Sequence, residues 1–150
     1  MDACDRLAIG FCVRGMFWKW ACIVRAISTP ESKAQVQQTR LAKFAAQIVD
    51  ISAKLPKTPQ GTHVSKQLLK SGTSAAANYA EARAAESRSD FIHKLRLVLK
   101  ELNETAVWLQ LIVENSWISA EKMTRIVAEN EELCRMTAAS IKTAGGFDRS

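Results

Sequence analysis

The sequence has few of the residues that interrupt helices and few of those that build metal or catalytic sites. Its 150 residues include only six glycines and three prolines, and most of them fall where helices would end. Two histidines and the lack of any C-x-x-C pair leave no zinc-ligand spacing. No Ser-His-Asp set, nucleophilic Cys-His pair or phosphate-cradling glycine loop can be assembled from the other residues. We therefore expect no enzymatic activity, no metal and no cofactor.

Histidine is also too scarce for a metal centre inside a helical bundle. A di-metal bundle site needs glutamates on two helices and Glu-x-x-His on the two others. The nearest match is the single pair Asp90 and His93, at an expected helix start where Asp90 is better explained as a cap. His63 lies beside an expected loop, and we expect it to be solvated.

Cysteine is present at four positions, but their placement does not predict disulfides. Cys4, Cys12 and Cys22 fall within the first 22 residues, and Cys134 stands alone near the other end. A disulfide framework is therefore not expected, and a reducing cytoplasm is the simpler location.

Residues 1–30 differ from the rest of the chain. No 18-residue window in this range is free of charge, which argues against a membrane span. Asp2 and Asp5 stand where a signal peptide carries positive charge. We expect residues 1–30 to be an accessory or artefactual extension, poorly ordered, rather than a membrane anchor; an interfacial amphipathic segment is the alternative.

Apolar residues recur at steps of three and four along four segments after residue 30, and no period-two strand pattern competes with them. The expected helices cover 31–56, about 62–85, the segment that follows a capping pattern at 87–90, and 119–145. Short connections predict an all-α, antiparallel up-down-up-down four-helix bundle over residues 31–146, with a tail over 147–150. The expected core stripes are Leu41, Phe44, Ala45, Ile48, Ile51 and Leu55; Val64, Leu68, Ala75 and Tyr79; Phe91, Leu95, Val98, Leu102, Ala106, Leu109 and Val113; and Met123, Ile126, Val127, Leu133, Thr137 and Ile141.

Two helices carry features that a single bundle core does not need. Gly72 lies in the middle of the second helix, where it costs up to about 1 kcal/mol relative to alanine. Close approach of another helix, or tolerance of the local Ser71–Ser74 run, would explain it. On the third helix Ile92, Leu99 and Trp108 widen the apolar stripe. So broad a face predicts that this helix also packs against another subunit.

Polar residues interrupt the second and third helices where a buried stripe is expected. Ser74, Asn78 and Glu81 follow one another at steps of four and three on an alanine-lined helix. Glu101, Asn103 and Glu104 precede an apolar run on the next helix. Unpaired buried polar groups cost roughly 1–3 kcal/mol, so these residues need partners. We interpret the six as a structural polar motif that fixes how the two helices meet, within or between subunits, rather than as a catalytic site.

Positive charge is concentrated in the first half of the bundle. The whole chain carries a formal charge of +6. Residues 31–100 hold 12 Lys and Arg against five Asp and Glu, whereas residues 101–150 hold five against eight. This asymmetry indicates a surface that faces a polyanion, or head-to-tail packing of subunits. The candidate phosphate contacts are Arg40, Lys43, Lys54, Lys57, Lys66, Lys70, Arg83, Arg88, Lys94, Arg96 and Lys100.

Aromatic residues among these cations are few, and Phe44, Tyr79 and Phe91 all have positions expected of a core. Base stacking is therefore not favoured, and we expect any nucleic-acid contact to be with the backbone.

Two blocks of the sequence resemble one known family. Lys66 to Ser74 (KQLLKSGTS) is followed by Asn78 to Ala82 (NYAEA), and the third helix contributes Lys100 to Thr105 (KELNET) with Trp108 and Leu109. Together they resemble the bacterial four-helix bundle proteins, also called 23S rRNA-intervening-sequence proteins, over about residues 35–141. The resemblance implies an antiparallel four-helix bundle assembled as a ring-like homopentamer.

A related branch of that family is the accessory variability protein of diversity-generating retroelements. The resemblance to it implies contact with RNA or DNA backbone and with a reverse transcriptase. Taken with the charge pattern, the sequence predicts a cytoplasmic, non-enzymatic homo-oligomer that binds RNA or a ribonucleoprotein, with no membrane partner. The alternative is a protein-binding oligomeric scaffold without a nucleic-acid role.

Overall fold

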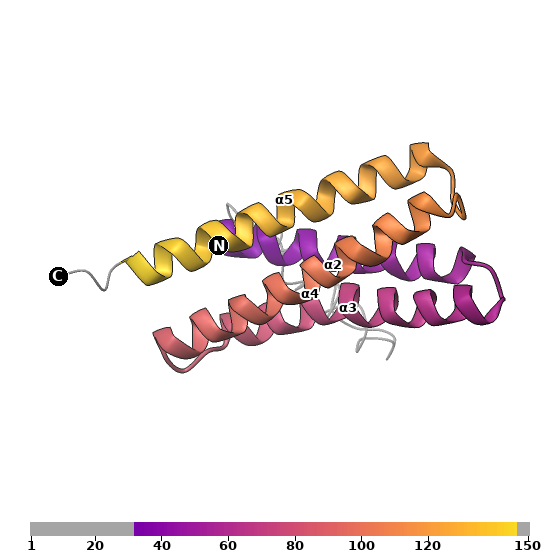
Figure 1. Cartoon of the computed structure of the whole chain (residues 1–150). Coiled ribbons are helices and arrows are strands. Elements are labelled where there is room, and N and C mark those ends of the chain that lie inside the picture. The colour runs from indigo at the N-terminus through magenta and orange to yellow at the C-terminus, as the bar shows by residue number, and fades with distance from the viewer. Residues whose placement is uncertain (1–31, 147–150) are drawn as a thin grey trace, which may run out of the picture. The chain divides into compact units, whose positions relative to one another are not determined.

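The fold is a bundle of four helices joined in sequence by short connections. The structure, a computed structural model, describes residues 32–146. The helices are α2 (Lys33–Lys54), α3 (Pro59–Arg83), α4 (Arg88–Glu114) and α5 (Ala120–Gly145). Figure 1 shows them running in alternating directions. The expected all-α up-down bundle is confirmed, while the expectations for residues 1–30 and 147–150 lie outside the described residues.

The helix starts follow from local chemistry. Thr58 Oγ1 accepts a hydrogen bond from the Gly61 amide at 3.2 Å, and Pro59 occupies the first turn of α3. Proline needs no amide partner there, so α3 begins at Pro59 and not near residue 62 as expected from the sequence. Ser87 Oγ accepts from the Asp90 amide at 3.1 Å, which confirms the predicted cap of α4.

The buried stripe of α4 alternates steps of three and four throughout its length. Its members are Leu95, Val98, Leu102, Thr105, Leu109 and Ile112. The expected positions Ala106 and Val113 are exposed instead. Thr105 can replace an apolar residue because its hydroxyl donates to the Glu101 carbonyl at 2.8 Å and pairs with Ser71 Oγ at 2.9 Å. The strict heptad-like pattern keeps this stripe against its neighbours along the whole helix.

Gly72 of α3 lies against Ile48 of α2. A β-carbon built at this position would stand 2.7 Å from Cγ2 and 2.8 Å from Cγ1 of Ile48, which is fully buried. Real β-carbons do not approach side-chain carbons this closely, so only glycine fits without a shift. Of the two explanations offered by the sequence, close approach of another helix is confirmed.

A buried polar chain crosses the bundle at the other end of α2. Gln37 Nε2 donates to Thr137 Oγ1 of α5 at 3.1 Å, and Tyr79 Oη of α3 donates to Gln37 Oε1 at 3.3 Å. Thr137 in turn donates to the Leu133 carbonyl at 2.8 Å. Burial raises the pKa of Tyr79, so its hydroxyl keeps the proton that it donates. Three helices are therefore held in register by one buried glutamine.

Replacing Gln37 by methionine should cost about 1–3 kcal/mol of unfolding free energy, because Tyr79 and Thr137 lose a buried partner while the volume is nearly kept. Urea unfolding followed by circular dichroism, at one protein concentration, measures the loss. Gln47→Met on the same helix is the control, since Gln47 is exposed. Equal stability of the two variants would show that the buried chain contributes nothing.

Candidate nucleic-acid interface

A groove of about 640 Å³ runs between the first and last helices of the bundle. It forms there because α2 and α5 are the least closely packed pair of neighbouring helices. The Arg40–Glu129 and Gln37–Thr137 contacts show that the two helices run antiparallel. The groove therefore extends from Arg40 and Glu129 at one end to Lys54 and Ile118 at the other. Its apolar lining comes from Phe44, Ile51, Ile118 and Ile126.

Five cations line this groove, and we call it the cationic groove. Arg40, Lys43 and Lys54 come from α2, and Lys122 and Arg125 come from α5. Two carboxylates among residues 32–146, Asp50 and Glu129, also line it. Within residues 32–146, no ion pair or side-chain hydrogen bond engages Lys43, Lys54, Lys122 or Arg125. The groove thus presents an excess of positive charge beside an apolar surface.

Two of these cations were missed by the sequence analysis. Lys122 and Arg125 belong to the half of the chain with net negative charge, so a tally by segment hides them. Their three-residue spacing does place them on one face of α5, and Glu129 follows at the next helical step. Counting charges separately for each face of α5 could have found them. The acidic residues Glu121 and Glu131 are exposed outside the groove, so they would not have been counted with Lys122 and Arg125.

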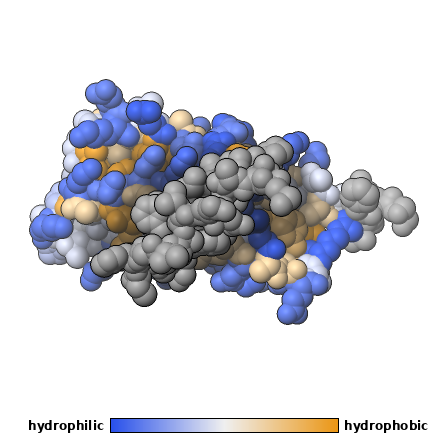
Figure 2. All heavy atoms as spheres, turned by 180° about the vertical axis from the view of Figure 1, so that it is seen from behind, coloured by the Kyte–Doolittle hydropathy of each residue, from blue (hydrophilic) through white to orange (hydrophobic). Residues whose placement is uncertain are grey.

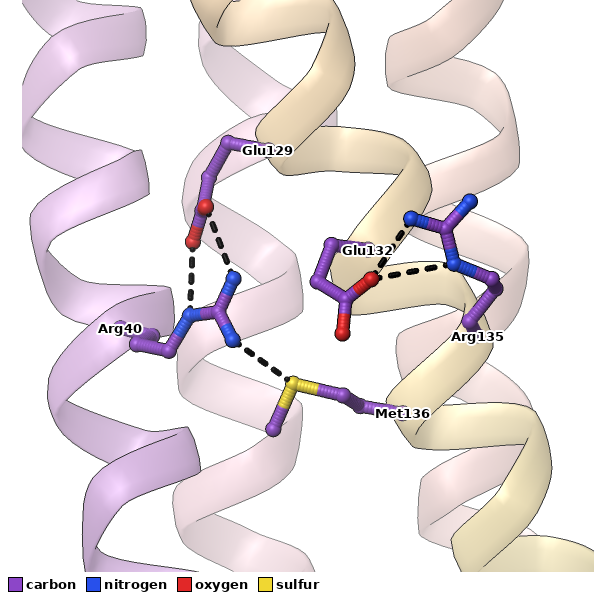
Figure 3. Close-up of polar contacts among 5 residues, drawn as sticks. All are labelled: Arg40, Glu129, Glu132, Arg135 and Met136. Carbon is purple, nitrogen blue, oxygen red and sulfur yellow. Dashed lines mark hydrogen bonds and ion pairs between the residues drawn. The ribbon is translucent and has the colours of Figure 1, made fainter.

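Arg40 is held by α5 through every nitrogen of its guanidinium group (Figure 3). Nε donates to Glu129 Oε1 at 3.0 Å, and Nη2 donates to Glu129 Oε2 at 2.8 Å. Nη1 lies 3.1 Å from the sulfur of Met136. The hydrogen bond to Glu129 raises the pKa of Arg40, so its charge is secure. Both side chains of the pair keep about 30% exposure, at 32% and 30%.

A second ion pair lies along α5 and shares no hydrogen bond with the first, although the charge of Glu132 also acts on Arg40 (Figure 3). Arg135 Nη2 lies 2.6 Å from Glu132 Oε2, one helical turn away along the same helix. The hydrogen bond from Arg135 lowers the pKa of Glu132. Neither residue lines the cationic groove. Two carboxylates three residues apart on α5 therefore have different partners, one inside the groove and one outside.

The remaining candidate cations are dispersed. Lys94 Nζ lies 2.6 Å from Glu81, and this hydrogen bond raises the pKa of Lys94. Arg83 donates to Gln35 and Gln38 of α2, and Arg88 donates to the Ala144 carbonyl at 2.6 Å. The structure brings Arg40, Lys43 and Lys54 together and leaves the others apart. Exposed and outside the cationic groove are Lys57, Lys66, Lys70, Arg96 and Lys100.

The polar column of α3 does not lie on the buried stripe, contrary to the expectation. Ser74 and Asn78 are half-buried and Glu81 is exposed, whereas Ala75 and Tyr79 are buried. The column is one residue out of step with the stripe, which is a rotation of about 100° on an α-helix. Asn78 Nδ2 donates to the Ser74 carbonyl of its own helix at 2.9 Å. Of the three column residues, Glu81 is the one that an ion pair within residues 32–146 connects to α4, through Lys94.

The polar residues of α4 are likewise not buried. Glu101 and Glu104 are half-buried and Asn103 is exposed. Glu104 accepts a hydrogen bond from the indole of Trp108 at 3.4 Å, and Asn103 lies 3.8 Å from the Cys134 sulfur. The six motif residues therefore form no common cluster. No group of three His, Cys, Asp or Glu side chains within residues 32–146 is placed to hold a metal ion.

Three of the six exposed large apolar side chains within residues 32–146 lie on α4. Val107, Leu111 and Val113 keep 55%, 39% and 39% exposure. Hydrophilic residues predominate on the face in Figure 2, with smaller hydrophobic areas between them.

None of the helices in the described range has the length and apolar character needed to cross a membrane.

Taken together, the fold and the groove define a helical bundle with a cationic seam between its first and last helices. A family model for the 23S rRNA-intervening sequence protein matches residues 33–139, and the chain belongs to this family. It is also similar to a crystal structure from Bacteroides thetaiotaomicron, a protein with unknown function from the S23 ribosomal protein family. The two share 38% identity with a TM-score of 0.69, over 74% of this chain and 99% of that chain. No curated protein matches the sequence.

Proposed function

We propose that this chain is a non-catalytic, cytoplasmic binding module that holds the backbone of RNA in the cationic groove between α2 and α5. One observation carries the proposal. Five cations from two helices line the same groove, whereas two carboxylates line it. Family membership supports the fold on which this groove is built. The chain would then contact a reverse transcriptase or another ribonucleoprotein through the RNA bound to that partner.

The chemistry of the groove supports backbone contact rather than base reading. Lys43, Lys54, Lys122 and Arg125 have no side-chain partner to give up within the described range. Phosphates can therefore bind to them by displacing only counterions and water. Phe44, which lines the groove, is fully buried, so its ring is not available for base stacking.

Binding of a short single-stranded RNA of mixed sequence to the full chain, measured over a salt series, tests the proposal. The affinity should fall linearly on a log–log plot, with a slope of about −0.7 for each phosphate neutralised. Four free cations predict a slope near −3, as an order of magnitude. Absence of binding at low salt, or binding that does not weaken with salt, would leave the protein-scaffold alternative.

We also propose that the chain is a homo-oligomer, with the homopentamer implied by the family resemblance as the expected state. The support is the face of α4 on which Val107 and Leu111 stay exposed in the single chain. An apolar helix face in a folded chain is typical of a surface that another protein covers.

The double substitution Val107→Lys and Leu111→Lys should convert the oligomer to a single chain. Each subunit would otherwise have to bury two charges in the interface. Light scattering at micromolar concentration should give five times the 16.6 kDa chain mass for the unmodified protein and one chain mass for the variant. The control is the pair Val49→Lys and Leu69→Lys, which are exposed on α2 and α3 at 45% and 38%. A single-chain mass for the unmodified protein would contradict the oligomer.

A further inference from the structure

One cation of the cationic groove is already held in an ion pair. Arg40 stands at one end of the groove and is the only one of the five cations there with an ion-pair partner among residues 32–146. Its partner Glu129 binds it through both carboxylate oxygens, in the two-pronged geometry that arginine also uses for phosphate. A carboxylate and a phosphate cannot hold the same two donors together.

We infer that Glu129 is an internal competitor of the RNA phosphate for Arg40. In the free protein it occupies the guanidinium donors, and in the complex a phosphate displaces it. This inference rests on the proposed function of the groove. The pair is open to displacement because about a third of each side chain is exposed, so a phosphate can reach the guanidinium group. Glu129 therefore limits how tightly RNA is held at this end of the groove.

The neighbouring groups favour this role for Glu129 in particular. Asp50 is the other carboxylate of the groove, but it is exposed and holds none of the groove cations in an ion pair within the described chain. Met136 contacts Nη1 from the far side, so Arg40 keeps one α5 contact when the carboxylate leaves. Arg40 is thereby kept near the groove and ready for a phosphate.

The test compares Glu129→Gln with Glu132→Gln, two substitutions that remove the same charge three residues apart on α5. Binding of a short single-stranded RNA of mixed sequence should tighten by about three- to tenfold in Glu129→Gln. The salt slope should become steeper by about 0.7, because one more phosphate is neutralised. Glu132→Gln should change the affinity less, since Glu132 lies outside the groove, is paired with Arg135 and acts on Arg40 only through its charge, without a hydrogen bond.

A double-mutant cycle separates an effect through Arg40 from a change in net charge. In the Arg40→Gln background, Glu129→Gln should tighten RNA binding no more than Glu132→Gln does. Equal tightening by the two glutamine variants in the unmodified background would overturn the inference and leave the proposed function standing. An unmodified protein that binds no RNA at any salt would overturn both.

Discussion

Replacing Lys43, Lys54, Lys122 and Arg125 together by glutamine should lower RNA affinity by roughly 100-fold at low salt. These four side chains are the groove cations without an ion-pair partner in residues 32–146, so they are free to neutralise phosphates. Removal of four contacts should also flatten the salt slope by about 3. Helicity and unfolding free energy should change little, because no ion pair or side-chain hydrogen bond engages any of the four within residues 32–146.

The control removes the same residue types from the other side of the bundle. Lys66, Lys70, Arg96 and Lys100 are exposed on α3 and α4, and like the groove set they comprise three lysines and one arginine. Their replacement by glutamine should reduce affinity by only a few-fold through the change in net charge. If both quadruple variants lose the same affinity, the binding is a property of total charge and not of the groove.

Gly72→Ala should destabilise the chain by up to about 2 kcal/mol, although alanine is the better helix former. Alanine would gain about 1 kcal/mol of helix propensity. The new β-carbon, however, would overlap Cγ1 and Cγ2 of Ile48, and overpacking of this kind costs about 1–3 kcal/mol or more. These carbons branch next to the α2 backbone, so they cannot swing away as the end of a long side chain can. Chemical unfolding at fixed protein concentration measures the change.

The Ile48→Ala background should reverse the sign of that effect. With both Cγ atoms removed, Gly72→Ala should stabilise the chain by up to about 1 kcal/mol, the value of helix propensity alone. The reversal in a double-mutant cycle would identify steric contact between α2 and α3 as the reason for the glycine. A Gly72→Ala effect of equal size in both backgrounds would contradict that explanation.

Helices and their order are predictable from this sequence because the periodicity of apolar residues acts within each segment. Leu41, Phe44 and Ile48 recur at helical spacing and are all fully buried, and the Ser87 cap lies where its side chain predicts. The bundle follows because four amphipathic segments with short connections have few other ways to cover their apolar faces.

The exact buried stripe was harder to predict where polar residues belong to it. Thr105, Asn130 and Gln37 are buried because each finds a hydrogen-bond partner on its own or another helix. Such a partner depends on tertiary packing, which hydropathy does not report. For a related reason, Ser74 and Asn78 were expected on the buried stripe of α3. Alanines flank both residues, so hydropathy does not distinguish the true buried face of the helix from a face shifted by one residue.

The cationic groove could not be read from the sequence because its walls are distant in the chain. Arg40 and Glu129 are 89 residues apart and meet only when α5 closes the bundle against α2. Lysines such as Lys66 and Lys43 look alike in the sequence, and only the packing of α2 against α5 distinguishes them. Counting charges by segment therefore located the basic half of the chain but not the site within it.

The most direct test of the cationic groove is to map where RNA touches the unmodified full chain. A photoreactive single-stranded RNA can be crosslinked at low salt, and the modified peptides identified by mass spectrometry. We expect crosslinks within residues 40–54 of α2 and within residues 118–129, which comprise the end of the preceding connection and the start of α5; both ranges include residues that line the groove. These crosslinks should disappear when salt is raised. Crosslinks confined to the exposed faces of α3 and α4 would contradict the account.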